Sequence, residues 1–104
     1  MIRVSVMYAN GPDAQFDHEY YATKHCPMVA EKLKTFGCQR VEVDKGLGGG
    51  TPKAEAPFVA VCHIIMDSLE GFQTGMKEHG KEIMADVPNY TNLTPQVQIS
   101  KMVE

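Results

Sequence analysis

The chain has 104 residues, of which 43% are hydrophobic and 22% are charged, and its formal net charge is −3. This length is that of one small domain, and the scattered Lys and Arg residues form no basic stripe for nucleic acid or for an anionic membrane surface. The longest apolar run, residues 58–66, is too short to span a bilayer. The three cysteines, Cys26, Cys38 and Cys62, are odd in number and widely spaced, which favours free thiols and predicts a reducing, cytoplasmic location.

The first half of the chain predicts a strand, a helix and a second strand. Residues 2–8 alternate between two faces as a strand does, and the sequence NGPD at 10–13 ends this strand with strong turn chemistry. Apolar residues follow at helical spacing from 17 to 36, and Asp17 is a suitable N-cap. Residues 38–47 alternate again and predict the second strand.

Pro27 interrupts the first predicted helix. Because proline lacks the N–H group and its ring crowds the carbonyl four residues earlier, we expect the helix to break or kink near His25 and Cys26. A fresh turn would then begin with Pro27 as its first helical residue. Tyr21 lies on the same face as His25, four residues earlier. Two interpretations stay open at this point, because His25 either caps the kink or forms the polar centre of a functional site.

The second half of the chain predicts a loop, a buried strand, a helix and a last strand. The glycine-rich residues 46–57 lack the endings of a phosphate-binding or dinucleotide-binding loop, so we interpret them as a connector. Residues 58–66 are apolar on both faces, as in a central strand. Asp67 is the predicted N-cap of a helix that runs to about residue 85, and residues 96–103 predict the last strand.

This order of elements predicts an α+β, ferredoxin-like βαββαβ fold with one domain over residues 1–104. In this fold two helices cover one face of an antiparallel four-stranded sheet. The bare face would expose apolar side chains of residues 58–66, at a cost of about 25 cal/mol per Å² of apolar area. We therefore expect a homodimer in which the bare faces of two sheets pack together.

Several kinds of chemistry find no support in the sequence. The four histidines, His18, His25, His63 and His79, show neither HxxxH nor HExxH spacing, so we predict no metal site and no cofactor. No serine lies in a GxSxG turn. We interpret His63 as a buried neutral histidine with a hydrogen-bond partner.

The remaining possibility is a small, mostly apolar cavity between the sheet and the helices, of the kind that holds organic molecules. Seven residues are expected to reach its mouth: Tyr8, Phe16, Tyr20, Tyr21, His25, Asn89 and Tyr90. A neutral His25 is a suitable general base for taking a proton next to a carbonyl group. Tyrosine hydroxyls or Asn89 would then steady the enolate oxygen.

Four passages of the sequence resemble the EthD family, which is named for ethyl tert-butyl ether degradation. They are VSVMYAN, FDHEYYATKHCPMV, VEVDKGLGGG with PFVAVCHIIMDSLEGFQ, and MADVPNYTNLTPQVQIS. The resemblance covers essentially the whole chain. Within it, His25 of the HCP sequence matches the family histidine, and Tyr20 and Tyr21 match the aromatic residues before it. Cys26 stands where the family pattern has a larger residue such as Met, which changes the expected size of the pocket.

The resemblance implies a dimeric α+β barrel, made of two ferredoxin-like subunits, from a bacterial cytoplasm. It also implies a role in the breakdown of fuel ethers or similar xenobiotics, beside a cytochrome P450 oxidation system. Three functions stay open. The first is a cofactor-free oxidoreductase or isomerase-type enzyme, or an accessory factor, with His25 as base. The second is a ligand carrier without chemistry of its own, and the third is a haem protein with an axial histidine.

Overall fold

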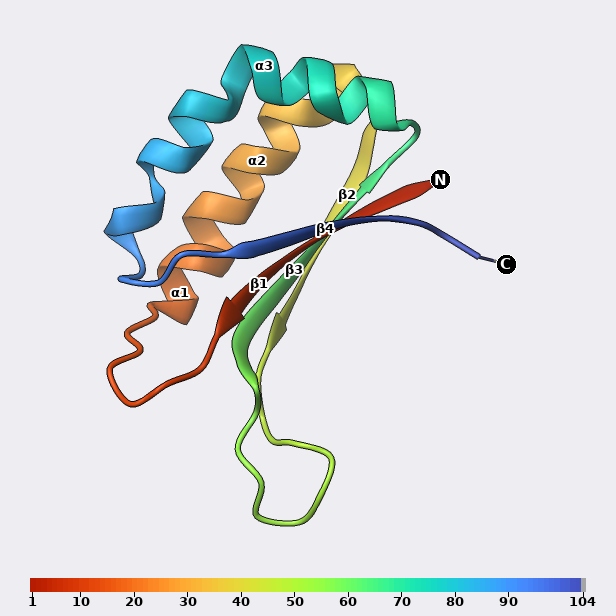
Figure 1. Ribbon diagram of the computed structural model, residues 1–104. Coiled ribbons are helices and arrows are strands. Elements are labelled where there is room, and N and C mark those ends of the chain that lie inside the picture. The colour runs from red at the N-terminus through yellow and green to blue at the C-terminus, as the bar shows by residue number, and fades with distance from the viewer. Residues whose placement is uncertain (104) are drawn as a thin grey trace.

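The structure is a computed structural model that describes residues 1–103. A single antiparallel sheet of four strands has the order β2-β3-β1-β4. The strands are β1 (Ile2–Ala9), β2 (Cys38–Lys45), β3 (Phe58–Met66) and β4 (Gln96–Lys101). All of the long helices lie on one face of this sheet, as Figure 1 shows. The predicted ferredoxin-like α+β fold is therefore confirmed.

The first helical segment contains a widened turn where the sequence predicted a break or kink. It consists of α1 (His18–Tyr20), a π-helical turn η1 (Tyr21–His25), α2 (Cys26–Leu33) and a 3₁₀ turn η2 (Lys34–Phe36). The N–H group of Cys26 donates to the carbonyl of Tyr21, five residues earlier. Pro27 cannot donate to the carbonyl four residues before it, and the helix accommodates this by widening one turn instead of breaking. The predicted irregularity therefore lies at the expected place, next to His25 and Cys26, and it is a widened turn instead of a break.

The caps of the helices differ in part from those predicted. Asp17 caps α1 as expected, and its carboxylate accepts from the N–H group of Tyr20 at 3.0 Å. The second long helix, α3 (Leu69–Ala85), is capped by Ser68, which accepts from the N–H group of Gly71 at 3.0 Å. Asp67, the predicted cap, instead accepts from the side chain of a residue at the start of β2. The short η3 (Val87–Asn89) follows α3 and leads toward β4.

Two glycines let α3 approach the end of the first helical segment closely. A Cβ atom on Gly71 would collide with the carbonyl oxygen of Phe36. A Cβ atom on Gly75 would lie 2.6 Å from a methyl group of Leu33. A larger residue at Gly71 would require the backbone to shift, and one at Gly75 would require the Leu33 side chain to move. These two glycines therefore allow α3 to pack closely against the end of the first helical segment.

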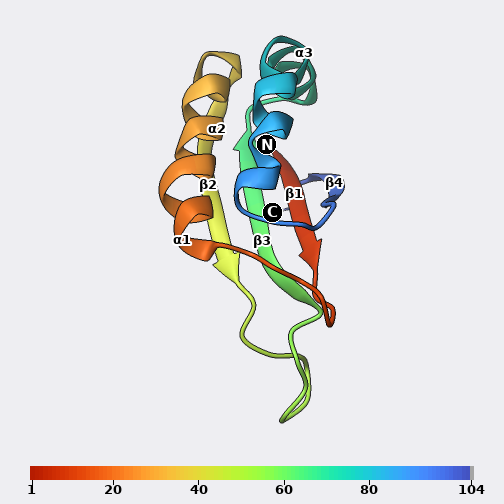
Figure 2. The same ribbon diagram turned by 90° about the vertical axis from the view of Figure 1, so that its left-hand side faces the viewer.

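The edge strand β4 lies beyond the cover of the helices, as Figure 2 shows. Val97 and Ile99 pair with Val6 and Val4 of β1 and share their face of the sheet. They are nevertheless 57% and 45% exposed. The helical layer is thus incomplete along the β4 side of the sheet, and this gap gives access to the space between the layers.

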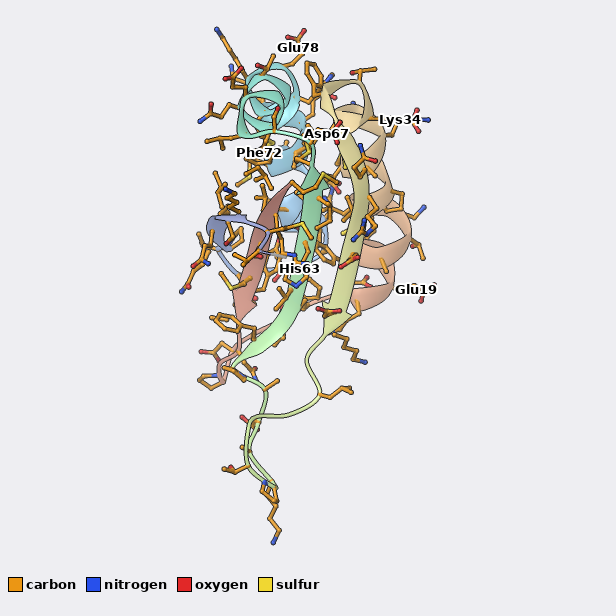
Figure 3. All side chains as sticks on the ribbon, turned by 90° about the vertical axis from the view of Figure 1, so that its right-hand side faces the viewer. Glu19, Lys34, His63, Asp67, Phe72 and Glu78 are labelled. Carbon is orange, nitrogen blue, oxygen red and sulfur yellow. The ribbon has the colours of Figure 1, made fainter. Side chains whose placement is uncertain are left out.

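The sheet face without helices is less apolar than the sequence suggested, and Figure 3 looks onto it. His63 lies on this face, where the hydroxyl of Ser5 is 3.0 Å from its Nδ1 atom and Asp44 is 3.4 Å from its Nε2 atom. The predicted hydrogen-bond partner of His63 is therefore Ser5, although the ring is only partly buried. Ile65 on the same face is fully buried and pairs with Arg3. A polar row thus crosses the face that was expected to be bare and apolar.

Candidate functional site

A cavity of about 370 Å³ lies between the sheet and the helices. It is lined by residues from β1, β3, both long helices and the approach to β4: Val4, Val6, Tyr8, Tyr21, His25, Val29, Cys62, Ile64, Phe72, Met76, Ile83, Met84, Thr94, Pro95 and Val97. Aliphatic, aromatic and methionine side chains dominate this lining, and it contains no Lys, Arg, Asp or Glu. The cavity has the size and apolar character of a site for a small organic molecule.

His25 reaches the wall of the cavity because of the π-helical turn. The turn places Tyr21 and His25 together on the inner side, where both are buried and their rings stack with centroids 5.4 Å apart. The ring of His25 is 4% exposed, so both of its nitrogen atoms need partners within the protein. Wide turns of this kind often occur at functional sites.

Asp86, at the C-terminal end of α3, holds the ring of His25. It is the C-cap of α3, and its Oδ2 atom lies 2.8 Å from Nδ1 of His25. Its Oδ1 atom accepts hydrogen bonds from the hydroxyl of Tyr20 at 2.7 Å and from the amide of Asn89 at 2.9 Å. Partial burial opposes ionisation, but the hydrogen bonds from Asn89, Tyr20 and His25 outweigh it and lower the pKa of Asp86. The carboxylate therefore stays ionised near neutral pH and accepts a hydrogen bond from the Nδ1–H group of His25.

Two tyrosines extend this arrangement on the other side of the ring. The hydroxyl of Tyr90 lies 3.4 Å from Nε2 of His25, which is a long hydrogen bond, and 2.5 Å from the hydroxyl of Tyr8. Burial, the largest effect on both, raises the pKa of Tyr8 and of Tyr90, so both are neutral hydroxyls at physiological pH. Asp86, His25, Tyr90 and Tyr8 form one hydrogen-bonded chain, which we call the polar chain.

The loop that carries Tyr90 is fixed to the segment before α1. The backbone carbonyl of Tyr90 accepts from the N–H group of Asp17 at 2.8 Å. The hydroxyl of Thr91 donates to the carbonyl of Gln15 at 2.6 Å, and Thr91 pairs with Phe16 in an isolated β-bridge. These contacts place Tyr90 against the π-helical turn although 65 residues separate it from His25.

The seven residues proposed from the sequence for the cavity mouth fall into three groups. Tyr8, Tyr21 and His25 line the cavity, and Tyr90 lies directly behind them. Tyr20 and Asn89 contact Asp86 and do not line the cavity. Phe16 packs its ring against Tyr8, Tyr21 and Tyr90, also outside the lining. The role of all seven in binding or catalysis stays a prediction.

The sequence reasoning missed Asp86. Its partner His25 lies 61 residues away, so no local spacing connects the two. The one available signal was its position three residues after the buried Ile83, which continues the inward stripe of α3 with a carboxylate.

Two buried cysteines, Cys26 and Cys62, lie close to the polar chain. Within residues 1–103, no group of three or more His, Cys, Asp or Glu side chains is placed to hold a metal ion. Hydrogen bonding to the neighbouring Cys62 and burial raise the pKa of Cys26, whereas the hydrogen bond with Cys26 lowers the pKa of Cys62, which lines the cavity. No Lys or Arg lines the cavity to stabilise a Cys62 thiolate, whereas the carboxylate of Asp86 is in place to stabilise a protonated His25. His25 is therefore the group at the cavity best suited to chemistry.

Comparison with known proteins identifies the family. The sequence model of the EthD domain matches residues 10–94. The chain belongs to the EthD family. A solved EthD-like protein from Ralstonia eutropha JMP134 is 45% identical, with a TM-score of 0.94 over 99% of this chain and 92% of that one. Among curated proteins, no match was found.

More distant solved structures share the fold. An EthD-family protein from Bacillus halodurans C-125 is 21% identical to this EthD protein, with a TM-score of 0.73 and 99% of both chains covered. A protein from an uncultured marine organism, described as dimeric and ferredoxin-like, is 12% identical, with a TM-score of 0.61 over 100% of this chain and 96% of that one. These two likenesses support the ferredoxin-like fold. Within residues 1–103, none of the helices has the length and hydrophobicity needed to cross a bilayer.

Proposed function

We propose that this EthD protein binds a small organic molecule in the cavity and that His25 acts on it as a general base. The observation that carries this proposal is the position of His25, which lines a largely apolar cavity of about 370 Å³ while its Nδ1 atom is held by Asp86 outside the lining. A paired histidine is costly to bury, and the cavity gives this one a space in which its chemistry can be used.

The geometry supports a division of roles within the pair. Asp86 accepts from Nδ1 of His25, which leaves Nε2 as the basic atom. When Nε2 takes a proton, directly or through Tyr90, the carboxylate of Asp86 stabilises the imidazolium that forms. Tyr20 and Asn89 keep the carboxylate in place and therefore act as positioning residues. Proton transfer of this kind suits an isomerase-type reaction or the first step of a cofactor-free oxidation.

The alternative of a ligand carrier shares the cavity and differs only in the role of His25. A haem protein with His25 as axial ligand is less well supported, because Nδ1 and Nε2 of this ring already face Asp86 and Tyr90. Membership in the EthD family supports a place in xenobiotic or alkyl ether degradation. A cytochrome P450 partner, a bacterial origin and a cytoplasmic location stay predictions from that resemblance.

We also propose that the protein works as a homodimer that joins the two sheet faces without helices. Met7, Val59 and Val61 on this face remain partly exposed in the single chain. Asp44 and the pair formed by Arg40 and Glu42 supply both signs of charge, as a twofold, self-complementary contact requires. The dimeric ferredoxin-like neighbour agrees with this assembly.

The binding proposal is tested by closing the cavity. Val97 lines the cavity from the exposed edge strand, so Val97→Trp should obstruct it with little effect on the core. Ile99→Trp is the matched control, because Ile99 lies two residues further along β4 on the same face, is partly exposed and does not line the cavity. A panel of small aromatic and alicyclic compounds should shift cavity resonances in NMR spectra of the wild type and of Ile99→Trp. The same compounds should leave Val97→Trp unchanged, and equal shifts in both variants would reject the cavity as the site.

The role of His25 is tested with any compound that the wild type converts. His25→Ala should abolish turnover while the compound still binds, because the cavity wall is apolar elsewhere. Full turnover by this variant would reject His25 as the base. A compound that binds and is never converted by the wild type would favour the carrier.

A further inference from the structure

The hydrogen bonds of the polar chain run in one direction. Asp86, ionised because its pKa is lowered, can only accept hydrogen bonds. His25 must therefore donate from Nδ1, which leaves Nε2 as an acceptor. The donor available to Nε2 is the hydroxyl of Tyr90 at 3.4 Å. Each proton in the chain thus points toward the carboxylate.

Tyr8 ends the chain at the cavity. Tyr90 has one hydroxyl proton, and once this proton is directed to His25 its oxygen can only accept. The Tyr90 oxygen accepts a hydrogen bond from the hydroxyl of Tyr8 at 2.5 Å. The single hydroxyl proton of Tyr8 is then engaged in this bond and cannot be donated to a ligand. Tyr8 lines the cavity whereas Tyr90 does not. The chain therefore leaves the Tyr8 oxygen as an acceptor. The neighbouring Tyr21 hydroxyl can donate to one of its two lone pairs, and the second lone pair is available to a donor on a ligand.

The rest of the cavity lining disfavours charged ligands. No Lys or Arg lines it to pair with a carboxylate or a phosphate, and no Asp or Glu lines it to pair with an ammonium group. Burying an unpaired ion in such a place costs several kcal/mol, so an ionised ligand is disfavoured.

We propose that the cavity takes an uncharged, largely apolar molecule that bears a hydroxyl group (an alcohol, a phenol or an enol), and that this hydroxyl donates to Tyr8. This inference rests on the proposed function and names its ligand class. An ether of the same shape offers only an acceptor. For Tyr8 to bond with it, Tyr8 would have to donate to the ether and accept the hydrogen bond of Tyr90, which leaves Nε2 of the buried His25 without a donor. We expect at least a tenfold preference for the hydroxyl compound.

Three probes of nearly equal shape test the inference: 4-tert-butylphenol, 4-tert-butylanisole and 4-tert-butylbenzoate, titrated at pH 8. The methyl groups of ¹³C-labelled methionines report the location, because Met76 and Met84 line the cavity and Met28 does not. The phenol should shift Met76 and Met84 with a Kd at least tenfold lower than that of the anisole, and the benzoate should bind most weakly.

Two variants test the direction of the chain. In Asp86→Asn the amide can donate to Nδ1 of His25, so the chain can reverse and Tyr8 can donate to an ether. Tyr90→Phe removes the hydroxyl to which Tyr8 donates, so Tyr8 can donate to an ether in this variant as well. This second variant tests the inference if Asp86→Asn folds poorly. In both, the preference for the phenol over the anisole should fall to about twofold or less. Asp67→Asn makes the same substitution away from the cavity and should keep the wild-type preference.

The outcomes separate the ligand class from the proposed function. Anisole binding as tightly as the phenol in the wild type, tightest binding by the benzoate, or a preference that survives in both Asp86→Asn and Tyr90→Phe would overturn the ligand class. Binding at this site would still stand. If no probe shifts Met76 or Met84 at millimolar concentration, both this inference and the proposed binding site are overturned.

Discussion

Removal of Asp86 should destabilise the fold more than its partly exposed position suggests. Asp86→Ala leaves the Nδ1–H group of His25 without an acceptor while the ring stays 4% exposed, and an unpaired buried donor costs about 1–3 kcal/mol. The hydrogen bonds from Tyr20 and Asn89 are lost as well, at positions where water replaces them and each contributes about 0.5–1 kcal/mol. We expect the free energy of unfolding to fall by about 2–5 kcal/mol in total.

Urea unfolding at one fixed protein concentration measures this change, because a dimer would make the stability depend on concentration. Tyr20→Phe is the matched control, since it removes one hydrogen bond to Asp86 and leaves His25 paired, and it should cost about 0.5–1 kcal/mol. Nitrogen-15 spectra of the His25 ring should show the proton on Nδ1 in the wild type and in Tyr20→Phe. A loss below about 1 kcal/mol in Asp86→Ala would refute the claim that Asp86 holds the histidine.

Three further predictions concern packing, pH and assembly. Gly71→Ala should destabilise by at least about 2 kcal/mol because its methyl group collides with a backbone carbonyl, whereas Gly80→Ala, whose methyl would lie 3.5 Å from its nearest neighbour, should stabilise by about 0.5–1 kcal/mol. Equal effects in urea unfolding would contradict this account of α3. Because the pKa of Asp86 is lowered on folding, its contribution to stability is complete above about pH 4 and is lost as the pH falls through the folded pKa. The stability difference between the wild type and Asp86→Asn should therefore shrink from pH 5 to pH 2, and a constant difference would argue against it. Val61→Lys on the sheet face without helices should shift the sedimentation coefficient from dimer to monomer, whereas Thr35→Lys on the helical side should not. A wild type that sediments as a monomer would exclude the proposed dimer.

The sequence was sufficient for the fold because its signals are local. The alternation in residues 2–8, the turn at 10–13 and the helical spacing of apolar residues each specify one element, and their order allows few topologies. Pro27 was a different case. A proline in a helix can be accommodated by a break, a kink or a widened turn, and all three remove the same hydrogen bond. The packing of Tyr21 and His25 against the sheet decides among these three forms. That packing depends on contacts with residues far away in the sequence, so local spacing does not predict it.

The site was only partly predictable for a related reason. Tyr8, Tyr21, His25 and Tyr90 were selected as residues that could reach the mouth of a cavity, and the fold brings these four together. Asp86 was not selected, because an aspartate at the end of a helix is ordinary surface chemistry until its partner is known. A contact between distant residues was also missed on the sheet face without helices, where Ser5 and His63 meet although they are 58 residues apart in the sequence.

The cost of the polar chain is itself an argument for function. Apolar side chains of similar size in place of a buried histidine, its carboxylate and two tyrosines would often leave a protein equally or more stable. The members of the polar chain lie on different elements of the fold. The desolvation of each member is offset by hydrogen bonds only if the next member is in position. Such an arrangement is a poor way to stabilise a domain of 104 residues. It is an effective way to place one basic nitrogen and one lone pair at the wall of an apolar cavity, where a bound hydroxyl would meet no competing water.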